Sequence, residues 1–351
     1  MAVPKLRFKE FDGDWTSKQL GKIIGISSAS RVFKEQWQDS GVPFFRTSDV
    51  VSIFKNKENE KAYISLELFE ELAKKSGKIK QGDLLVTGGG SIGIPYLVPN
   101  DQPLYFKDAD LLWMKSSGIV EGSFLYNFFI SPKFREYLKS ISHTGTISHF
   151  TIEQAKATPF GFPSKEEQTK IASFLSAVDE KISQLTQKHA LLSQYKQGMM
   201  QKLFSQQIRF KADDGSEFGE WEEVRLGNLV DLTSGFAFKS DFFSEDGNKL
   251  ITPKNFTTTG KANFTDTNTK WTTEISDKKY ICRPNDLLVL LTDLTQSCEL
   301  LGKPILLSQD DGNVLLNQRI VKIIPNRKLE KPFLLYLLLT DDFHELIVST
   351  A

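Results

Sequence analysis

Residues 164–204, SKEEQTKIASFLSAVDEKISQLTQKHALLSQYKQGMMQKLF, decide how the rest of the chain is organised. The stretch contains no proline, and Ser164 followed by Glu167 forms a capping box, which predicts the start of a helix. Apolar residues then recur in two seven-residue series offset by four, the a/d pattern of a coiled coil. We predict that this apolar stripe contacts a partner helix through Ile171, Leu175, Val178, Ile182, Leu185 and Leu192.

The alternative is an amphipathic helix that packs only on its own domain. A straight surface helix drifts by about 20° per heptad, so a sustained period of seven residues favours the coiled coil. His189 and Lys196 interrupt the stripe at core positions. They indicate either a poorly packed end of the coiled coil or polar residues that fix the alignment of two helices.

The sequences on either side of this helix repeat each other. The matches, in the same order in both copies, are Gly13-Asp14-Trp15 with Gly219-Glu220-Trp221, 82–86 (GDLLV) with 285–289 (NDLLV), Gly93 with Gly302, and Phe124 with Phe333. Matched residues lie 203 to 209 positions apart, which is the length of a domain, whereas solenoid units span roughly 20–50 residues. The sequence therefore predicts two related domains.

Each copy combines strand and helix patterns. Residues 83–86 and 286–291 are short apolar runs after turn signals, which predict strands. Residues 123–140 and 332–348 have apolar residues at three- and four-residue spacing, which predicts one helix near the end of each copy. We expect an α+β fold with two similar domains that contain twisted sheets, separated by the long helix. The expected boundaries are 1–160, 161–208 and 209–351.

The composition excludes several classes of protein. The 351 residues carry 44 basic and 44 acidic side chains, so any basic surface must be local. No apolar run approaches the 18 residues of a membrane span, and the first residues lack the apolar core of a signal peptide. Two cysteines, Cys282 and Cys298, are too few for a disulfide framework. We expect a cytoplasmic protein with reduced thiols and no membrane association.

Recognisable catalytic and metal-binding motifs are missing from the sequence. Four histidines show no zinc-ligand spacing, and no nucleophile elbow or Walker A motif occurs. Residues 87–93 (TGGGSIG) are rich in glycine but lack the Gly-Lys-Ser/Thr ending of a phosphate loop, so a tight turn after a strand is the better interpretation. We expect no catalytic residue, no metal and no cofactor.

Local motifs resemble one known family. Residues 162–168 (FPSKEEQ), 171–175 (IASFL) and 179–182 (DEKI) are similar to the central conserved region of the specificity subunits of type I restriction-modification systems. Residues 145–151 (GTISHFT) are similar to the segment that closes their target-recognition domain, and 211–221 and 235–240 (GFAFKS) to the opening of the second such domain. The resemblance covers nearly the whole chain, and the Glu-Glu-Gln motif is its most specific part.

The resemblance implies a non-catalytic reader of double-stranded DNA. In that family each recognition domain reads one half of a split site, and two conserved helices pair antiparallel and set the distance between the halves. Methyltransferase subunits dock on these helices, motor-nuclease subunits join them, and the whole assembly is a restriction endonuclease and adenine methyltransferase. The alternatives are a DNA-recognition module of a different restriction-methylation enzyme, a coiled-coil scaffold without a DNA role, or an enzyme whose motif is not recognisable.

The resemblance has one departure. The point at which the first copy enters its closing segment corresponds, in the second copy, to a position beyond Ala351. We therefore expect the second recognition domain to be incomplete at its C-terminal end and the second conserved helix to be missing. Either the chain is shortened, or the helix at 164–204 pairs with another chain, of which a second copy is the simplest case.

Polar and basic residues follow the opening strand of each copy. Such loops carry the base and phosphate contacts of DNA-binding proteins, although an ordinary solvated loop has the same composition. The residues that we predict to face DNA are Ser30, Arg31, Lys34, Arg46 and Ser48 in the first copy, and Lys239, Ser240, Lys254 and Asn255 in the second.

Overall fold

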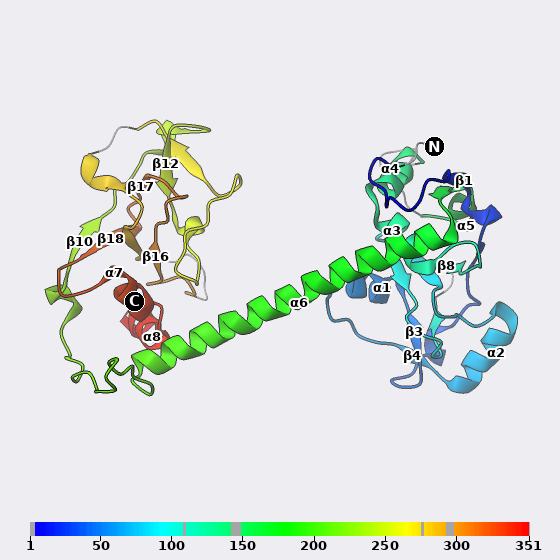
Figure 1. The fold of residues 1–351 in the computed structure, drawn as a ribbon, viewed down its shortest axis with the longest axis horizontal. Coiled ribbons are helices and arrows are strands. Elements are labelled where there is room, and N and C mark those ends of the chain that lie inside the picture. Colours follow the sequence, from blue (N-terminus) through cyan, green and yellow to red (C-terminus); the bar gives the residue numbers. More distant parts are fainter. Residues whose placement is uncertain (1–3, 108–109, 142–148, 275–276, 293–297, 351) are drawn as a thin grey trace. The chain divides into compact units, whose positions relative to one another are not determined.

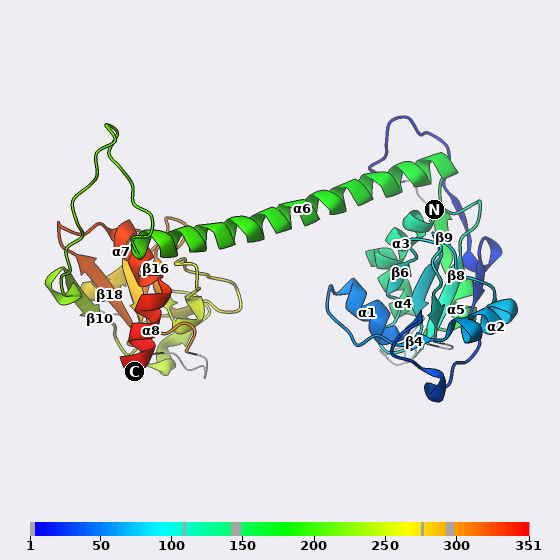
Figure 2. The same cartoon turned by 90° about the horizontal axis from the view of Figure 1, so that it is seen from below.

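The computed structural model describes residues 4–107, 110–141, 149–274, 277–292 and 298–350. It divides into two compact units, Met1–Leu185 and Thr186–Ala351, whose boundary falls within the long helix α6 (Lys165–Phe204). The predicted segment 145–151 lies largely outside the described residues. The α+β fold with two similar domains and a long helix between them in sequence is confirmed (Figures 1 and 2).

The first unit contains two small sheets. The larger is antiparallel and has the order β2 (Gly25–Ser27), β8 (Leu111–Lys115), β5 (Leu84–Thr87), β6 (Pro95–Leu97). The smaller has the order β4 (Tyr63–Ile64), β3 (Val42–Phe45), β7 (Tyr105–Phe106), in which β3 and β7 run parallel. Strand β5 is buried along its whole length because both of its faces pack against apolar side chains.

Helices and one further strand pair complete the first unit. They are α1 (Thr47–Phe54), α2 (Leu66–Ser76), α3 (Gly122–Ile130), α4 (Pro132–Ser140), α5 (Ile152–Ala157), and the antiparallel strands β1 (Thr16–Gln19) and β9 (Pro159–Phe162). Aromatic side chains from α3, α4 and β9 dominate the main core, where the rings of Phe129 and Phe134 lie 4.6 Å apart. Strand β9 leads directly into α6.

The second unit repeats this strand order. Its antiparallel sheet is β10 (Val230–Ser234), β18 (Ile320–Pro325), β15 (Leu287–Leu290), β16 (Pro304–Leu306). Its other sheet is β11 (Phe243–Ser244), β13 (Lys270–Thr272), β12 (Asn248–Ile251), β17 (Val314–Leu316), β14 (Ile281–Cys282), with β12 and β17 parallel. Helices α7 (Lys331–Leu338) and α8 (Asp341–Thr350) stand where α3 and α4 stand in the first unit. The internal repeat is therefore a repeat of topology.

Two backbone positions explain why the repeat is visible in the sequence. Gly93 and Gly302 both have positive φ, and a Cβ on either would meet a helix side chain at less than 3.0 Å. Gly82 and Asn285 also share a positive φ, which asparagine tolerates better than most residues. These matches mark turns whose geometry restricts the choice of residue.

The helix predicted near the end of each copy is in fact two helices. In the first unit Ser131 is extended, caps α4 by accepting from the Phe134 amide at 3.3 Å, and is followed by Pro132. The ring of a proline disfavours the helical conformation at the residue before it, so the first helix ends at Ser131. In the second unit the Thr340 hydroxyl accepts from the Phe343 amide in the same way.

Helix α6 extends for 40 residues, or about 60 Å. Ser164 caps it as predicted by accepting from the Glu167 amide at 3.3 Å, but the Glu167 carboxylate does not complete the capping box. The side chains of the predicted stripe differ in exposure. Ile171 and Leu175 are half-buried, whereas Val178, Ile182, Leu185 and Leu192 are exposed. Pairing of this stripe with another helix stays a prediction.

The polar position Lys196 lies where α6 meets the second unit. Its ammonium stands 5.0 Å from the ring centroid of Tyr336 on α7, and Met200 packs against the neighbouring core. A cation over an aromatic ring is a favourable contact, so the structure gives Lys196 a role within its own unit. None of the described helices combines the length and apolar character that a membrane span requires.

Candidate nucleic-acid interface

The first group of predicted contact residues lies in the segment between β2 and β3. Arg31 and Lys34 are exposed, and the Arg31 guanidinium lies 5.4 Å from the Phe33 ring centroid. Ser30 is half-buried, and its amide donates to the Tyr105 hydroxyl at 3.0 Å. Arg31 and Lys34 can therefore meet a phosphate backbone, whereas Ser30 fastens the base of the segment to the unit.

The second group lies at the N-terminus of α1. The Arg46 guanidinium donates to Asp49 at 2.9 Å and to the Glu60 carbonyl, and it lies 5.6 Å from the Trp37 ring centroid. The hydrogen bond to Asp49, with the charge of that carboxylate, raises the pKa of Arg46. Ser48 is exposed. Arg46 is thus held in a fixed position, as a residue that recognises a base edge must be.

A glycine-rich turn lies beside this helix start. Residues 88–94 join β5 to β6, and Gly90 and Gly93 have positive φ, in keeping with a tight turn. A Cβ on Gly90 would lie 3.7 Å from the Thr47 methyl, and Gly89 forms an isolated bridge with His149. Thr47 and His149 were not among the predicted contacts. Their proximity depends on the packing of distant segments, which no local pattern indicates.

In the second unit the predicted residues divide between surface and interior. Lys239, Ser240 and Lys254 are exposed. Asn255 is 0% exposed, and its side-chain oxygen accepts from the Thr252 amide and hydroxyl, both at 2.8 Å. A fully buried side chain cannot touch DNA, so in this structure Asn255 shapes the loop that presents Lys254.

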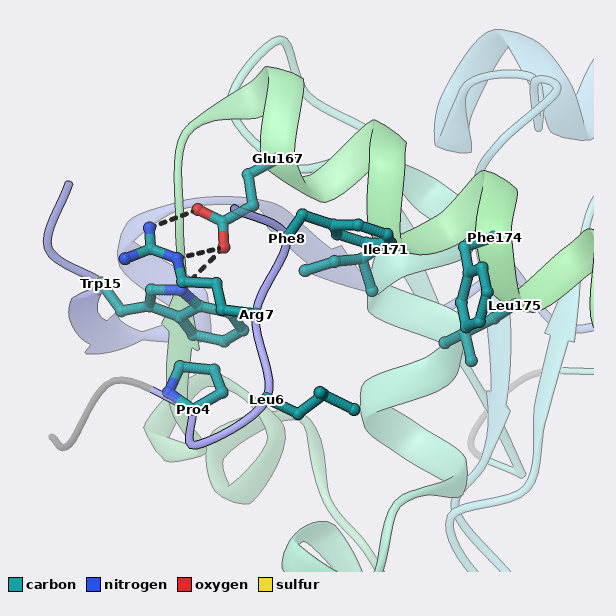
Figure 3. Close-up of a pocket in the computed structure, with 9 residues that line it drawn as sticks. All are labelled: Pro4, Leu6, Arg7, Phe8, Trp15, Glu167, Ile171, Phe174 and Leu175. Carbon is teal, nitrogen blue, oxygen red and sulfur yellow. Dashed lines mark hydrogen bonds and ion pairs between the residues drawn. The ribbon is translucent and has the colours of Figure 1, made fainter. Parts of the chain in front are cut away.

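The Glu-Glu-Gln motif at the start of α6 has a structural role. Glu167 is 1% exposed and accepts two hydrogen bonds from Arg7, at 2.6 and 2.7 Å, and a longer one of 3.4 Å from the Trp15 indole (Figure 3). The hydrogen bond to Glu167 and its charge raise the pKa of Arg7. Gln168 is fully buried and accepts from the Glu121 amide at 2.9 Å. The motif therefore binds α6 to the N-terminal segment and to α3.

Among the described residues, no cluster of histidine, cysteine and acidic side chains could hold a metal ion. The exposed residues of the candidate interface are cations and hydroxyls on segments that follow equivalent strands of the two units. Cations on loops contact phosphates, and hydroxyls can contact phosphates or base edges.

Comparisons with known proteins point to one family. The family model described as type I restriction modification DNA specificity domain matches residues 12–194 and 219–351. The MjaVIII specificity subunit of a type I restriction enzyme from Methanocaldococcus jannaschii is 30% identical over 233 residues, which are 62% of this chain and 52% of that protein. The HindI specificity subunit from Haemophilus influenzae is 28% identical over 230 residues, covering 62% of this chain and 47% of its own.

A solved structure shares the fold. The type I restriction-modification S subunit from M. genitalium has a TM-score of 0.53 and 18% identity, with 99% of this chain and 83% of that chain covered. In the sequence comparisons the matched regions span about half of each curated relative, from 41% to 55% of its length.

Proposed function

The chain belongs to the family of type I restriction modification DNA specificity domains, and we propose that each of its two units reads one half of a split DNA site. The observation that carries this proposal is the repeated topology, in which exposed cations follow equivalent strands in both units. Two readers joined by one helix would fix the separation of the half-sites, as subunit geometry does in dimeric DNA-binding proteins.

We propose further that the chain performs no chemistry of its own. It would direct methyltransferase subunits and motor-nuclease subunits to the site that it has bound, and these subunits would bring the cofactors. The purified chain, supplied with AdoMet, should then neither methylate nor cleave DNA. Co-purification with a methyltransferase subunit would separate this function from that of a scaffold.

The proposed DNA contacts are Arg31, Lys34, Lys239 and Lys254, with Ser48 and Ser240 beside them and Arg46 held by Asp49. A site is first selected from random duplexes with the complete chain, and affinity is then measured over a range of salt concentrations. The logarithm of the binding constant falls linearly with the logarithm of the salt concentration, and each phosphate contact contributes about 0.9 to the steepness of that slope. The double variant Arg31→Ala/Lys34→Ala should therefore weaken binding and make this slope shallower by about 1.8, the contribution of two contacts.

A matched control loses two charges elsewhere. Lys18→Ala/Lys165→Ala removes exposed cations from β1 and from the start of α6, so it should leave site preference and salt slope unchanged. Identical slopes for the two double variants would refute the contact assignment. Equal binding to all duplexes by the unmodified chain would refute the proposed function itself.

We also propose that the exposed part of α6 binds a second helix. Leu185 is 54% exposed and Leu192 56%, although burying a leucine contributes roughly 1.5–3 kcal/mol. Leu185→Asp/Leu192→Asp should abolish self-association or methyltransferase binding in sedimentation experiments. Gln187→Asp/Gln194→Asp adds the same charges at the same spacing beside the stripe and should not. A wild-type monomer that also fails to bind methyltransferase would contradict the proposal.

A further inference from the structure

The two units hold the segment after a central strand in the same way. Strands β3 and β12 each run parallel to a neighbouring strand, β7 or β17. At the fourth position after each strand lies a buried polar side chain, Asp49 at 7% exposure and Asn255 at 0%. Each accepts a hydrogen bond of 2.8 Å from a backbone amide three positions earlier, that of Arg46 or Thr252. We call Asp49 and Asn255 the clamp residues.

In the first unit the clamp residue holds the loop between α1 and β4. The side-chain amide of Asn59 donates to the Asp49 carboxylate at 2.7 Å and to the Ser48 hydroxyl at 3.2 Å. The Arg46 guanidinium, which is paired with Asp49 at 2.9 Å, also donates to the Glu60 carbonyl. Two successive residues of the loop are therefore tied to the start of α1.

In the second unit the clamp residue holds a longer loop, between the 3-10 turn Pro253–Asn255 and β13. The Asn255 side-chain amide donates to the Asn263 carbonyl at 3.3 Å and to the side-chain oxygen of Asn268 at 3.4 Å. Asn268 in turn accepts from the Thr265 amide at 2.8 Å and donates to the Asn263 carbonyl at 3.1 Å. A buried amide is costly without hydrogen bonds, so this network favours one conformation of the loop.

Two further contacts fix the middle of this second loop. Gly260 has a positive φ, and its carbonyl accepts from the Leu306 amide on β16 at 3.0 Å. A Cβ on Gly260 would lie 2.9 Å from the Leu339 side chain, so the backbone lies close against the unit. Phe264 packs against the core, and the Lys249 ammonium lies 4.6 Å from its ring centroid. The loop is therefore held at its base, at its middle and where it returns to the sheet.

The side chains that these two loops present to solvent differ. The second loop, residues 256–269, includes six threonines. The exposed ones are Thr258, Thr259, Thr265 and Thr267. The first loop, residues 55–62, contains no hydroxyl side chain and instead exposes three lysines and two glutamates. Hydroxyls can donate to or accept from base edges, whereas lysine donates to guanine and glutamate accepts from cytosine. Equivalent loops thus offer different recognition chemistry.

We propose that these two loops determine the base preference of the two half-sites, each loop for one half, and that the clamp residues position them. The inference rests on the proposed function and names the residues that give it specificity. The clamp residues touch no base and act through the loops, and the proposed contacts Ser48 and Lys254 each lie one position before a clamp residue. A loop held in one conformation discriminates between bases because a misplaced donor loses its hydrogen bond.

The first experiment selects bound duplexes from a random pool with the complete chain and compares variants at both half-sites. Thr265→Ala/Thr267→Ala should lower the preference at one half-site by at least about tenfold, the loss expected for one or two base contacts. The salt slope should stay the same because neither residue is charged. The matched control Thr16→Ala/Thr169→Ala removes two exposed threonines from β1 and α6, and should alter neither half-site.

The second experiment separates positioning from stability. Asn255→Asp keeps the oxygen that accepts from Thr252 but loses the donor to Asn263 and Asn268, so it should lower the preference at the same half-site. Thr252→Val removes a different hydrogen bond of Asn255, the one from the Thr252 hydroxyl, and leaves its contacts with the loop in place. Both variants should melt at a lower temperature, and only Asn255→Asp should change the base preference measured well below melting. Equal changes of preference in the two would refute the positioning role.

The reciprocal variant is Asn59→Ala, which releases the first loop and should lower the preference at the other half-site only. This variant and the threonine pair change exposed residues, so the test stands even where Asn255→Asp does not fold. Unchanged preference in either variant, or loss at the same half-site in both, overturns the inference while split-site binding by the unmodified chain still supports the proposed function. Equal binding of all duplexes by the unmodified chain refutes the proposed function and this inference with it.

Discussion

Two similar segments, residues 4–15 and 208–221, which we call the first and second straps, show what one short sequence can and cannot determine. Arg7 and Arg209 lie in nearly identical local sequences and donate to the carbonyls of equivalent glycines, Gly13 and Gly219, so the conformation of the strap is local in origin. Burial is not local. Arg7 faces a carboxylate that is 1% exposed because α6 crosses the first strap, whereas the carboxylate that pairs with Arg209 is in solvent. The same motif thus pairs with a buried carboxylate in one unit and with an exposed one in the other.

The segments that follow the equivalent strands β3 and β12 also differ between the two units. After β3 the first unit forms helix α1, whose start is held by Arg46 and Asp49. After β12 the second unit forms only the short 3-10 turn Pro253–Asn255, and the buried amide of Asn255 organises the loop that follows. Equivalent strands therefore carry different surfaces. This is the arrangement expected when a constant scaffold presents variable recognition elements.

The largest expected effect on stability comes from breaking the buried ion pair between Arg7 and Glu167. Arg7→Met leaves the Glu167 carboxylate buried, with the Trp15 indole at 3.4 Å as its one remaining donor among the described residues, and an uncompensated buried charge is strongly destabilising. We expect the melting temperature of the first unit to fall by at least about 5 °C. Calorimetry measures the shift, and hydrogen exchange assigns it to a unit.

The second strap supplies the matched control. Arg209→Met removes an identical side chain whose partner is exposed, and exposed ion pairs contribute little. We expect its melting temperature to change by no more than about 2 °C. Equal shifts in the two variants would show that burial of Glu167 does not distinguish the two straps.

Most of the fold could be predicted from periodicity and repetition. The sequence predicts a helix at 164–204, and α6 lies at Lys165–Phe204. The prediction succeeds because seven-residue spacing and a serine cap are local signals. The repeat is visible in part through Gly93 and Gly302, where a positive φ and a close helix leave room only for hydrogen. Apolar spacing continues across the break at Ser131 and predicts a single helix there, although Pro132 is a local signal for the break.

The candidate site was less predictable. The sequence predicts that all of these polar residues face DNA, yet Ser30 and Asn255 make hydrogen bonds within the protein. Tyr105, the partner of the Ser30 amide, lies 75 positions away in the sequence, and only the fold brings the two together. Asn255 instead accepts from Thr252, three positions earlier, in a capping box that is a local signal. The sequence does not predict the role of Arg7 either, because its partner Glu167 is 160 positions away. Contacts across such separations leave no pattern in a single sequence.

A smaller difference between the units should appear at alkaline pH. Cys282 occupies the position in β14 that corresponds to Ile79 of the first unit, and both side chains are buried. Burial raises the pKa of the Cys282 thiol to about 12; Lys322 acts in the opposite direction and Asp286 adds to the rise. The thiol of the unfolded chain ionises near its ordinary pKa of about 8.5.

The sign of the pH effect follows from proton binding. Between pH 8.5 and 12 the unfolded state holds fewer protons at this site than the folded state, so stability falls as the pH rises, by up to about 1.4 kcal/mol per pH unit. Hydrogen exchange of both units between pH 8 and pH 10 should show the second losing about 1–2 kcal/mol more than the first. Cys282→Val has no titrating group and should remove the excess. If the excess persists in that variant, other groups of the second unit cause it, and the buried thiol does not distinguish the two units at high pH.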